Sequence, residues 1–137
     1  MIVIVDTGPL VALIDPDTRE HDWTHDHAMA LPSPLLTSEP VLTEAAFLLT
    51  RDGFDADELF ALVEAGVLSI AIEFNRERTA LRSLMRKYRN VPMSLADATL
   101  VRLSEMHQAS QVFTFDADFR IYRRHGNKVI PVLMPEE

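Results

Sequence analysis

Four acidic side chains stand at positions where the surrounding pattern does not call for a charge. Asp6 directly follows a short apolar strand at the start of the chain, and Asp116 follows a second apolar strand. Glu44 interrupts an otherwise apolar helix, and Asp97 stands in the first turn of another helix. A buried carboxylate without a partner is costly. Several of them in one protein therefore call for a shared partner, either a cation or arginine side chains.

A cluster of carboxylates points to hard-cation chemistry. The chain has no cysteine, which excludes thiolate metal sites, and all-oxygen ligation suits Mg²⁺ or Mn²⁺. Water bound to such an ion becomes more acidic and can attack phosphorus, while the ion neutralises charge on the phosphate oxygens. Two ions ~4 Å apart would support both the entering and the leaving oxygen. The hydroxyls of Thr7 and Thr114 could orient an acid or a water.

Each acid also has a purely structural explanation. Asp97 could be the reciprocal acid of a capping box with Ser94. Asp6 could cap the helix that follows it, Asp116 could be a turn residue, and Glu44 could lie on the exposed side of its helix. The four together favour a shared site, because strand ends and helix starts on one side of a parallel sheet converge.

The elements that must position these acids alternate between strands and helices. The β-branched run Ile2–Val5 indicates a strand buried on both faces, as inside a parallel sheet. The pattern predicts further strands over 35–37, 67–72, 112–114 and 129–133. It predicts helices over 9–14, 17–30, 39–51, 76–88, 95–107 and 117–124, and one from Asp55 to the turn at Gly66. This alternation predicts an α/β fold with a mostly parallel sheet flanked by helices, in a single domain over 1–137.

Smaller signals refine these boundaries. Ser38 is a good N-cap for the helix over 39–51, and Asn75 is expected to cap the helix over 76–88. Pro131 suggests that the last strand lies at an edge of the sheet. On the helix over 17–30, we expect Trp23 and Met29 to face inward.

Composition narrows the class of protein. A chain of 137 residues with 47% hydrophobic residues can bury a substantial core. No apolar run approaches the ~20 residues needed to span a bilayer, and no secretory signal is visible. We therefore expect a cytoplasmic protein with no membrane partner.

Charge is unevenly distributed along the chain. The net charge of −8 at first argues against a nucleic-acid partner. Residues 1–75 hold 2 basic and 14 acidic residues (−12), whereas 76–137 hold 11 basic and 7 acidic residues (+4). The basic residues gather on the helix over 76–88 and over 120–128. Two interpretations stay open, namely solvated helix faces or a surface that contacts phosphates.

Histidines offer a different metal chemistry. His21 and His25 are four residues apart and would share a helix face, as in some zinc sites. With no cysteine and with acids interleaved between the histidines, a solvated helix is the favoured interpretation.

The four acidic segments resemble the motifs of PIN-domain ribonucleases of the VapC toxin type. The segments are Val5–Leu13, Val41–Ala46, Ser94–Ala98 and Thr114–Phe119, in that order, and the resemblance covers nearly the whole chain. No single motif is specific, but four in order at suitable spacing are strong.

The resemblance implies a three-layer Rossmann-like PIN fold and Mg²⁺-dependent cleavage of RNA, with Mn²⁺ as a possible substitute. It implies metal ligation by Asp6 and Asp97, with Glu44 and Asp116 completing the acidic pocket directly or through water. Asp118 is a further candidate ligand, although one acid at the end of the motif can suffice.

The resemblance also implies partners. Proteins of this type commonly form homodimers and are often neutralised by an antitoxin that inserts a segment over the pocket. RNA is the implied substrate, and we expect Arg82 and Arg86 on the basic helix to contact it.

Three other functions fit the sequence less well. The triplet Asp6-Thr7-Gly8 also matches aspartic proteases, but that chemistry needs two triplets in an all-β fold. A phosphohydrolase with an aspartate nucleophile would want a second Asp at position 8, which is Gly. A catalytically silent PIN-like RNA-binding or scaffold protein would typically have lost one or more acids. All are present here, which favours an enzyme.

Overall fold

A parallel five-stranded sheet forms the centre of the computed structural model, which describes residues 1–136. The strand order is β3-β2-β1-β4-β7, and all four neighbouring pairs run parallel. The strands are β1 (Ile2–Val5), β2 (Leu35–Thr37), β3 (Leu68–Ile70), β4 (Ser110–Phe113) and β7 (Val132–Leu133). A separate antiparallel pair consists of β5 (Arg123–Arg124) and β6 (Lys128–Val129). The predicted α/β fold with a parallel sheet is confirmed, and β1 is its central strand.

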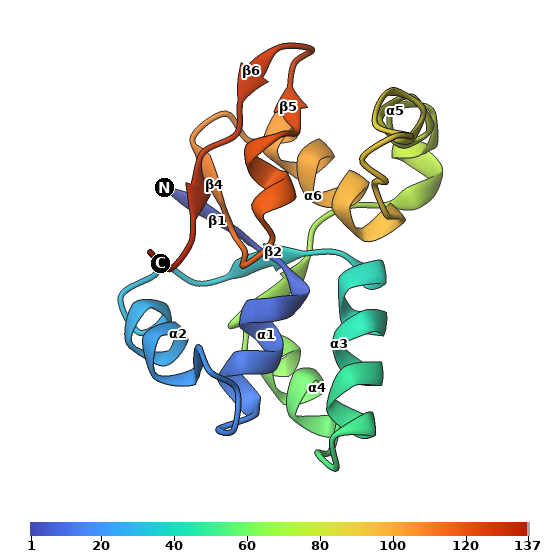
Figure 1. The fold of residues 1–137 in the computed structure, drawn as a ribbon. Helices are drawn as coiled ribbons and strands as arrows, with labels where there is room; N and C mark the ends of the chain where they lie inside the picture. The colour runs from blue at the N-terminus through green and yellow to red at the C-terminus, as the bar shows by residue number, and fades with distance from the viewer. Residues whose placement is uncertain (137) are drawn as a thin grey trace.

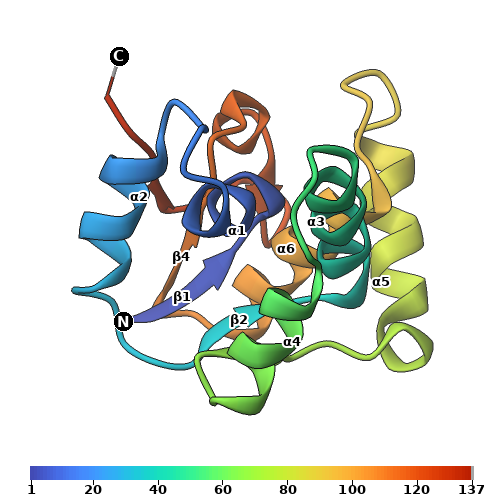
Figure 2. The same cartoon turned by 90° about the horizontal axis from the view of Figure 1, so that it is seen from below.

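Helices cover both faces of this sheet. They are α1 (Thr7–Ile14), α2 (His21–Ala28), α3 (Glu39–Arg51), α4 (Asp57–Glu64), α5 (Phe74–Lys87) and α6 (Leu95–Met106), with a 3₁₀ turn over Ala117–Arg120. In Figure 1, α1, α2 and α4 lie on one side of the sheet, whereas α6 and the 3₁₀ turn lie on the other. Figure 2 shows α1 over β1, with α2 and α3 on either side of α1. The molecule thus has three layers.

The central strand is apolar because both of its faces are covered. Val3, Ile4 and Val5 are at most 1% exposed. On one face of the sheet, α6 packs against β1 and contributes several fully buried side chains, including Leu100 and Leu103. Full burial on two faces explains the continuous β-branched run that the sequence shows in place of an alternating pattern.

Several predicted boundaries were wrong. The helix expected over 17–30 spans only His21–Ala28, because the Asp15 carboxylate accepts the Asp17 N–H at 2.8 Å and forms a local turn. Met29 does not face inward: it is 76% exposed just after the end of α2. Trp23 does pack inward, with its ring 5.7 Å from that of Phe113.

The C-terminal region also differs from the expectation. The helix expected over 117–124 is one 3₁₀ turn followed by β5, and Gly126, at φ +84°, lies in the loop that joins β5 to β6. The strand expected over 129–133 is interrupted at Pro131, after which β7 forms the edge of the sheet. The predicted edge position is confirmed.

Three helix starts differ from the prediction by two residues each. α1 begins at Thr7 and not at Pro9, directly after its N-cap Asp6. α5 begins at Phe74 with Glu73 at its N-cap, so Asn75 lies inside the first turn and does not cap it. α4 begins at Asp57, and Asp55 accepts the Asp57 N–H at 2.9 Å.

None of the helices described between residues 1 and 136 combines the length and apolarity needed to cross a membrane.

Candidate acidic active site

A cleft of about 500 Å³ opens where β1 and β4 end and α6 begins. It is lined by Asp6, Thr7, Gly8, Val11, Thr18, Glu20, Glu44, Leu48, Ser94, Asp97, Phe115 and Asp116. All four acids singled out in the sequence line this cleft, although they come from separate elements. The topology therefore brings them together at the carboxyl end of the parallel sheet, where ligands bind in open α/β folds.

Asp6 is the most enclosed of the four acids, at 8% exposed. It follows β1 and is the N-cap of α1, where one carboxylate oxygen accepts the Thr7 N–H at 2.7 Å. The other oxygen accepts the Thr114 hydroxyl, also at 2.7 Å. Both oxygens thus have a fixed donor, which holds the carboxylate in one orientation.

Glu44 enters the cleft from α3 and is itself exposed. Its Oε2 accepts the Thr7 hydroxyl at 3.3 Å. Thr7 therefore contacts two acids at once, Asp6 through its backbone N–H and Glu44 through its hydroxyl.

Asp97 is held by a capping box at the start of α6. The Ser94 hydroxyl accepts the Asp97 N–H at 3.0 Å, and Asp97 Oδ2 accepts the Ser94 N–H at 3.2 Å. The same Oδ2 also accepts the Tyr122 hydroxyl at 3.0 Å. The structural explanation of Asp97 is thus correct, and it does not exclude a functional one, because Oδ1 has no donor among the hydrogen bonds of residues 1–136.

Asp116 follows β4 and caps the 3₁₀ turn. Its N–H donates to the Thr114 hydroxyl at 3.0 Å, and its carboxylate accepts the Asp118 N–H at 2.9 Å. Thr114 therefore connects Asp6 and Asp116. Asp118 is not among the residues that line the cleft.

Burial and mutual repulsion shift the protonation of these acids. The pKa of Asp6 is raised from 3.8 to about 6, chiefly by burial. The hydrogen bonds from Thr114 and Thr7 lower this pKa, whereas like-charge repulsion from Asp97 and Glu44 contributes to the rise. The pKa of Asp97 is also raised, first by burial and also by the charge of Asp116, while its bonds from Ser94 and Tyr122 act in the opposite direction.

The donor set of the cleft fits a hard cation. Its acids are oxygen donors that repel one another, and a cation would remove that repulsion. Among residues 1–136, no three acidic or histidine side chains form a ready-made metal cage. Mg²⁺, however, keeps several waters and is usually held by one or two carboxylates together with substrate phosphates. Asp6 and Asp97 both line the cleft, and their carboxylates are oxygen donors of this kind.

A close approach of backbone to an aromatic ring shapes the cleft wall. A Cβ at Gly8 would lie 2.8 Å from Cδ2 of Phe115, closer than real Cβ contacts occur. Glycine at this position allows α1 to start directly beside the segment that follows β4.

Sequence reasoning missed Tyr122. It is fully buried, packs edge-on against Tyr88 and Phe119, and donates its hydroxyl to Asp97. Burial and the neighbouring acids raise the pKa of this phenol well above its usual value, so the hydroxyl stays a donor. No local pattern marks Tyr122, because its partner lies 25 residues earlier in the chain.

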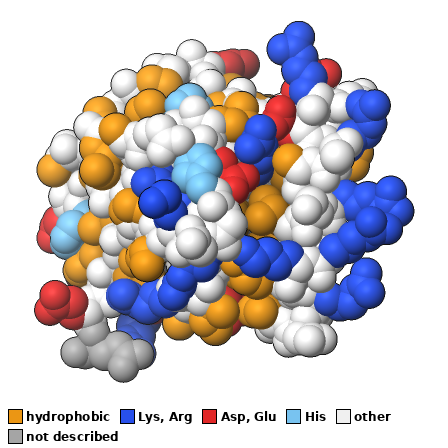
Figure 3. Space-filling model, turned by 90° about the horizontal axis from the view of Figure 1, so that it is seen from above, with side chains coloured by type: hydrophobic (Ala, Val, Ile, Leu, Met, Phe, Trp, Pro, Cys, Tyr) orange, Lys and Arg blue, Asp and Glu red, His pale blue; other side chains and the backbone are white. Residues whose placement is uncertain are grey.

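Arg82 and Arg86 do not line the acidic cleft. They lie on α5, beside a second groove. Figure 3 shows Lys and Arg side chains gathered along the edge of the molecule that α5 forms.

The two histidines with the spacing of some zinc sites, His21 and His25, lie on α2, where His21 Nδ1 is 2.6 Å from the Ala12 carbonyl oxygen.

Comparisons with protein families and with solved structures identify what this chain is similar to. The model of the PIN domain family matches residues 3–124. Among solved structures, the Mycobacterium tuberculosis toxin VapC20, described as a sarcin-ricin loop cleaving toxin, superimposes with a TM-score of 0.71 at 24% sequence identity. The match covers 85% of this chain and 91% of VapC20 and shows a shared fold. No curated protein matches the sequence. Because the family model spans nearly the whole chain, the protein belongs to the PIN domain family.

Proposed function

We propose that the protein is a metal-dependent endoribonuclease and the toxin of a VapBC-type toxin–antitoxin pair. The observation that carries this proposal is the convergence of Asp6, Glu44, Asp97 and Asp116 on one cleft. Membership of the PIN family and the fold shared with the RNA-cleaving toxin VapC20 support the same class of activity.

In this proposal Asp6 and Asp97 hold the ion, and Glu44 and Asp116 complete its surroundings directly or through water. Asp118 stays a further candidate ligand. A bound Mg²⁺, or Mn²⁺ in its place, would supply an acidified water and neutralise phosphate charge.

The residues around the acids hold them in position. Thr114 and the Thr7 N–H occupy both oxygens of Asp6, and Tyr122 with Ser94 occupies one oxygen of Asp97. The fixed oxygens face a cleft that also has apolar walls, formed in part by Leu48 and Phe115. Preorganisation of this kind lowers the reorganisation needed when a charged ligand arrives.

Three partners complete the proposal. RNA is the substrate, and Arg82 and Arg86 contact its phosphates. A protein antitoxin covers the acidic cleft, as is common for toxins of this type, and the functional unit is a homodimer.

The test is cleavage of a mixed RNA pool by the purified protein with Mg²⁺, Mn²⁺ or EDTA, beside Asp6→Asn. We expect fragments that need the metal and disappear with the substitution, since Asn cannot supply the charge of the carboxylate. Sequencing of the fragment ends would then identify the cleaved RNA. Equal cleavage by both proteins would indicate a contaminating ribonuclease, and no cleavage with metal binding intact would favour the catalytically silent alternative.

A further inference from the structure

One acid that lines the acidic cleft, Glu20, has no role in the proposed function. It reaches the cleft from the start of α2, together with Thr18. Glu20 is the N-cap residue of α2, yet its side chain makes no capping hydrogen bond. It also forms no ion pair within residues 1–136. Helix formation therefore does not explain this carboxylate, which is left for a ligand.

The segment around Glu20 is fixed to the end of α1. The Asp15 carbonyl accepts both the N–H of Thr18, at 3.2 Å, and the hydroxyl of Thr18. Directly after Glu20, the Nδ1 atom of His21 lies 2.6 Å from the Ala12 carbonyl oxygen. These contacts on either side of Glu20 hold its backbone at the wall of the cleft.

Phe115 supplies an aromatic surface in the same cleft. Its ring packs edge-on against Trp23, which follows Glu20 by three residues on α2, with 6.2 Å between the ring centroids. It also contacts Phe113 edge-on, and the backbone of Gly8 leaves no room for a Cβ beside it. The ring is half-buried, so these contacts fix it while its remaining surface lines the cleft. A fixed aromatic ring is a stacking surface for a base.

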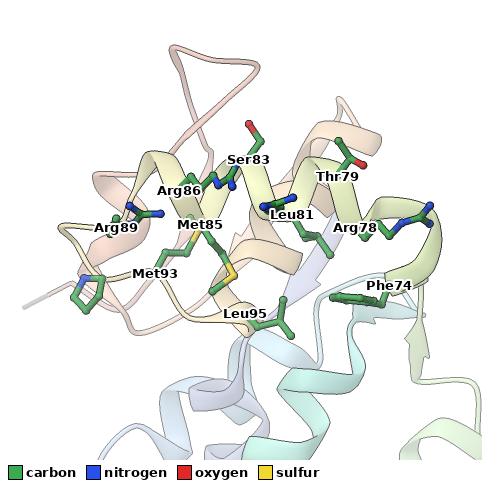
Figure 4. Close-up of a pocket in the computed structure, with 12 residues that line it drawn as sticks. Phe74, Arg78, Thr79, Leu81, Ser83, Met85, Arg86, Arg89, Met93 and Leu95 are labelled. Carbon is green, nitrogen blue, oxygen red and sulfur yellow. The ribbon is translucent and has the colours of Figure 1, made fainter.

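The polar side chains on the α2 side of the cleft accept hydrogen bonds and do not donate them. The Glu20 carboxylate is an acceptor, and the Thr18 hydroxyl already gives its hydrogen to a carbonyl. None of the residues within 1–136 that line the cleft is basic. The arginines lie elsewhere, and Figure 4 shows Arg86 and Arg89 along α5. This side of the cleft therefore repels a phosphate and suits a flat group that carries N–H donors.

Guanine matches these groups better than the other bases. Its Watson–Crick edge carries two adjacent donors, N1–H and N2–H, which fit the two oxygens of one carboxylate. Adenine and cytosine have an acceptor nitrogen beside their amino group, and uracil has a carbonyl on each side of its N–H. A carboxylate therefore meets a repelling atom in each of these three. The bases of single-stranded RNA can turn out, stack on aromatic side chains and present these edges.

We infer that Glu20 and Phe115 form a guanine subsite in the cleft. A guanine of single-stranded RNA stacks on Phe115 and donates N1–H and N2–H to the Glu20 carboxylate. This inference rests on the proposed nuclease function, because it names the base that the cleft accepts beside the bond that is cut.

Binding can be measured without cleavage in the Asp97→Asn protein, by fluorescence anisotropy. The probes are fluorescein-labelled heptanucleotides of uridine whose central position holds guanosine, inosine, adenosine or uridine. The guanosine strand should bind about tenfold more tightly than the all-uridine strand, as expected for a bidentate base contact. Inosine lacks the N2 amino group and should lose most of this preference, and adenosine controls for the stronger stacking of a purine.

Substitutions separate the two contacts. Glu20→Gln should reduce the preference for guanosine to within about twofold, because the amide replaces one acceptor oxygen by a donor. Its affinity for the all-uridine strand should stay equal or rise, since a charge that repels phosphate is gone. Phe115→Leu should weaken binding of both strands about fivefold or more, because every base can stack on the ring. Phe115→Tyr keeps the ring and should restore the affinity.

The chain offers a matched control at Asp22. This acid is exposed, lies in the first turn of α2 and does not line the cleft. Asp22→Asn should keep both the affinity and the guanosine preference within about twofold of the Asp97→Asn background. Circular dichroism would verify the fold of each variant. If Phe115→Leu fails to fold, Glu20→Gln still tests the inference, since the Glu20 side chain makes no capping bond.

The outcomes separate this inference from the proposed function. Wild-type cleavage of RNA with no preference for guanine beside the cut, or a Glu20→Gln protein that keeps the preference, would overturn the subsite and leave the nuclease standing. Binding that depends on guanosine and on Glu20, without wild-type cleavage, would support the subsite and overturn the nuclease. Free GMP that competes as well as the unlabelled guanosine strand would overturn RNA as the ligand and indicate a site for a nucleotide.

Discussion

At the scale of single residues, Asp6 carries the greatest electrostatic cost in the cleft. Its carboxylate is buried, and Asp97 and Glu44 repel its charge. The hydrogen bonds from Thr7 and Thr114 offset only part of this cost, because the pKa still rises to about 6. A binding site that holds repelling charges before its ligand arrives trades stability for function.

This cost predicts how stability depends on pH. Between pH 3.8 and about 6 the folded protein holds the Asp6 proton more tightly than the unfolded chain does. The contribution of Asp6 to the free energy of unfolding therefore falls as pH rises through this window, by about 3 kcal/mol at most. Asp6→Asn removes this contribution and should be the more stable protein at neutral pH, with the difference closing below pH 4.

Urea unfolding of both proteins in EDTA, from pH 3.5 to 8, measures this difference. Carboxylates elsewhere titrate in both proteins and cancel in the comparison. A difference in the free energy of unfolding that stays constant across the range would show that Asp6 is not perturbed as described.

At the scale of elements, the start of α6 both caps the helix and positions an acid of the cleft. Ser94 caps the helix, and the same capping box sets the position of Asp97 relative to Tyr122. The hydrogen bonds that cap the helix therefore also fix the position of Asp97 in the cleft.

We therefore expect Ser94→Ala to affect both stability and the site. Loss of the cap should lower the free energy of unfolding by about 1 kcal/mol. Because the Asp97 N–H loses the hydroxyl that accepts its hydrogen bond, the first turn that positions the Asp97 carboxylate loosens, and metal affinity measured by calorimetry should fall as well. Ser94→Thr keeps a capping hydroxyl and should restore most of both quantities, whereas a stability loss with unchanged metal affinity would reduce Ser94 to a helix cap.

At the scale of the whole molecule, one apolar core joins the layers on both sides of the sheet. β1, α1 and α6 all contribute to this core, and all three end or begin at the acidic cleft. A ligand bound there should therefore stabilise the complete fold and not one segment, provided that the domain unfolds in one cooperative step.

Thermal unfolding with and without metal tests this coupling. Mg²⁺ or Mn²⁺ at 100 times its Kd should raise the free energy of unfolding by about 2.7 kcal/mol and raise Tm. Asp97→Asn should fold normally, show little of this shift and lose cleavage. An equal shift in both proteins would place the ion elsewhere on this acidic molecule.

Prediction from sequence succeeded where local signals agree with the tertiary fold. The helix Glu39–Arg51 and the strand Leu35–Thr37 have the predicted bounds, since apolar periodicity and turn residues point to the same ends. It failed over 17–30 and 117–124, where side-chain turns and a hairpin replace helix that the polar pattern permitted. The Ser38 hydroxyl shows the same limit: Ser38 is the N-cap residue of α3, but its hydroxyl contacts Thr99, 61 residues away.

The sequence by itself determined the fold class and the identities of the four acids, because strand burial, helix caps and motif order are local properties of the chain. Only the tertiary structure decided which groups hold those acids and what lies beside them. Thr114 reaches Asp6 across 108 residues, and Tyr122 reaches Asp97 across 25. A groove lined by Arg82 and Arg86 of α5 and by Met93 likewise joins a basic helix to the segment before α6. These contacts depend on sheet order and on the packing of one layer against another, which no short pattern of residues encodes.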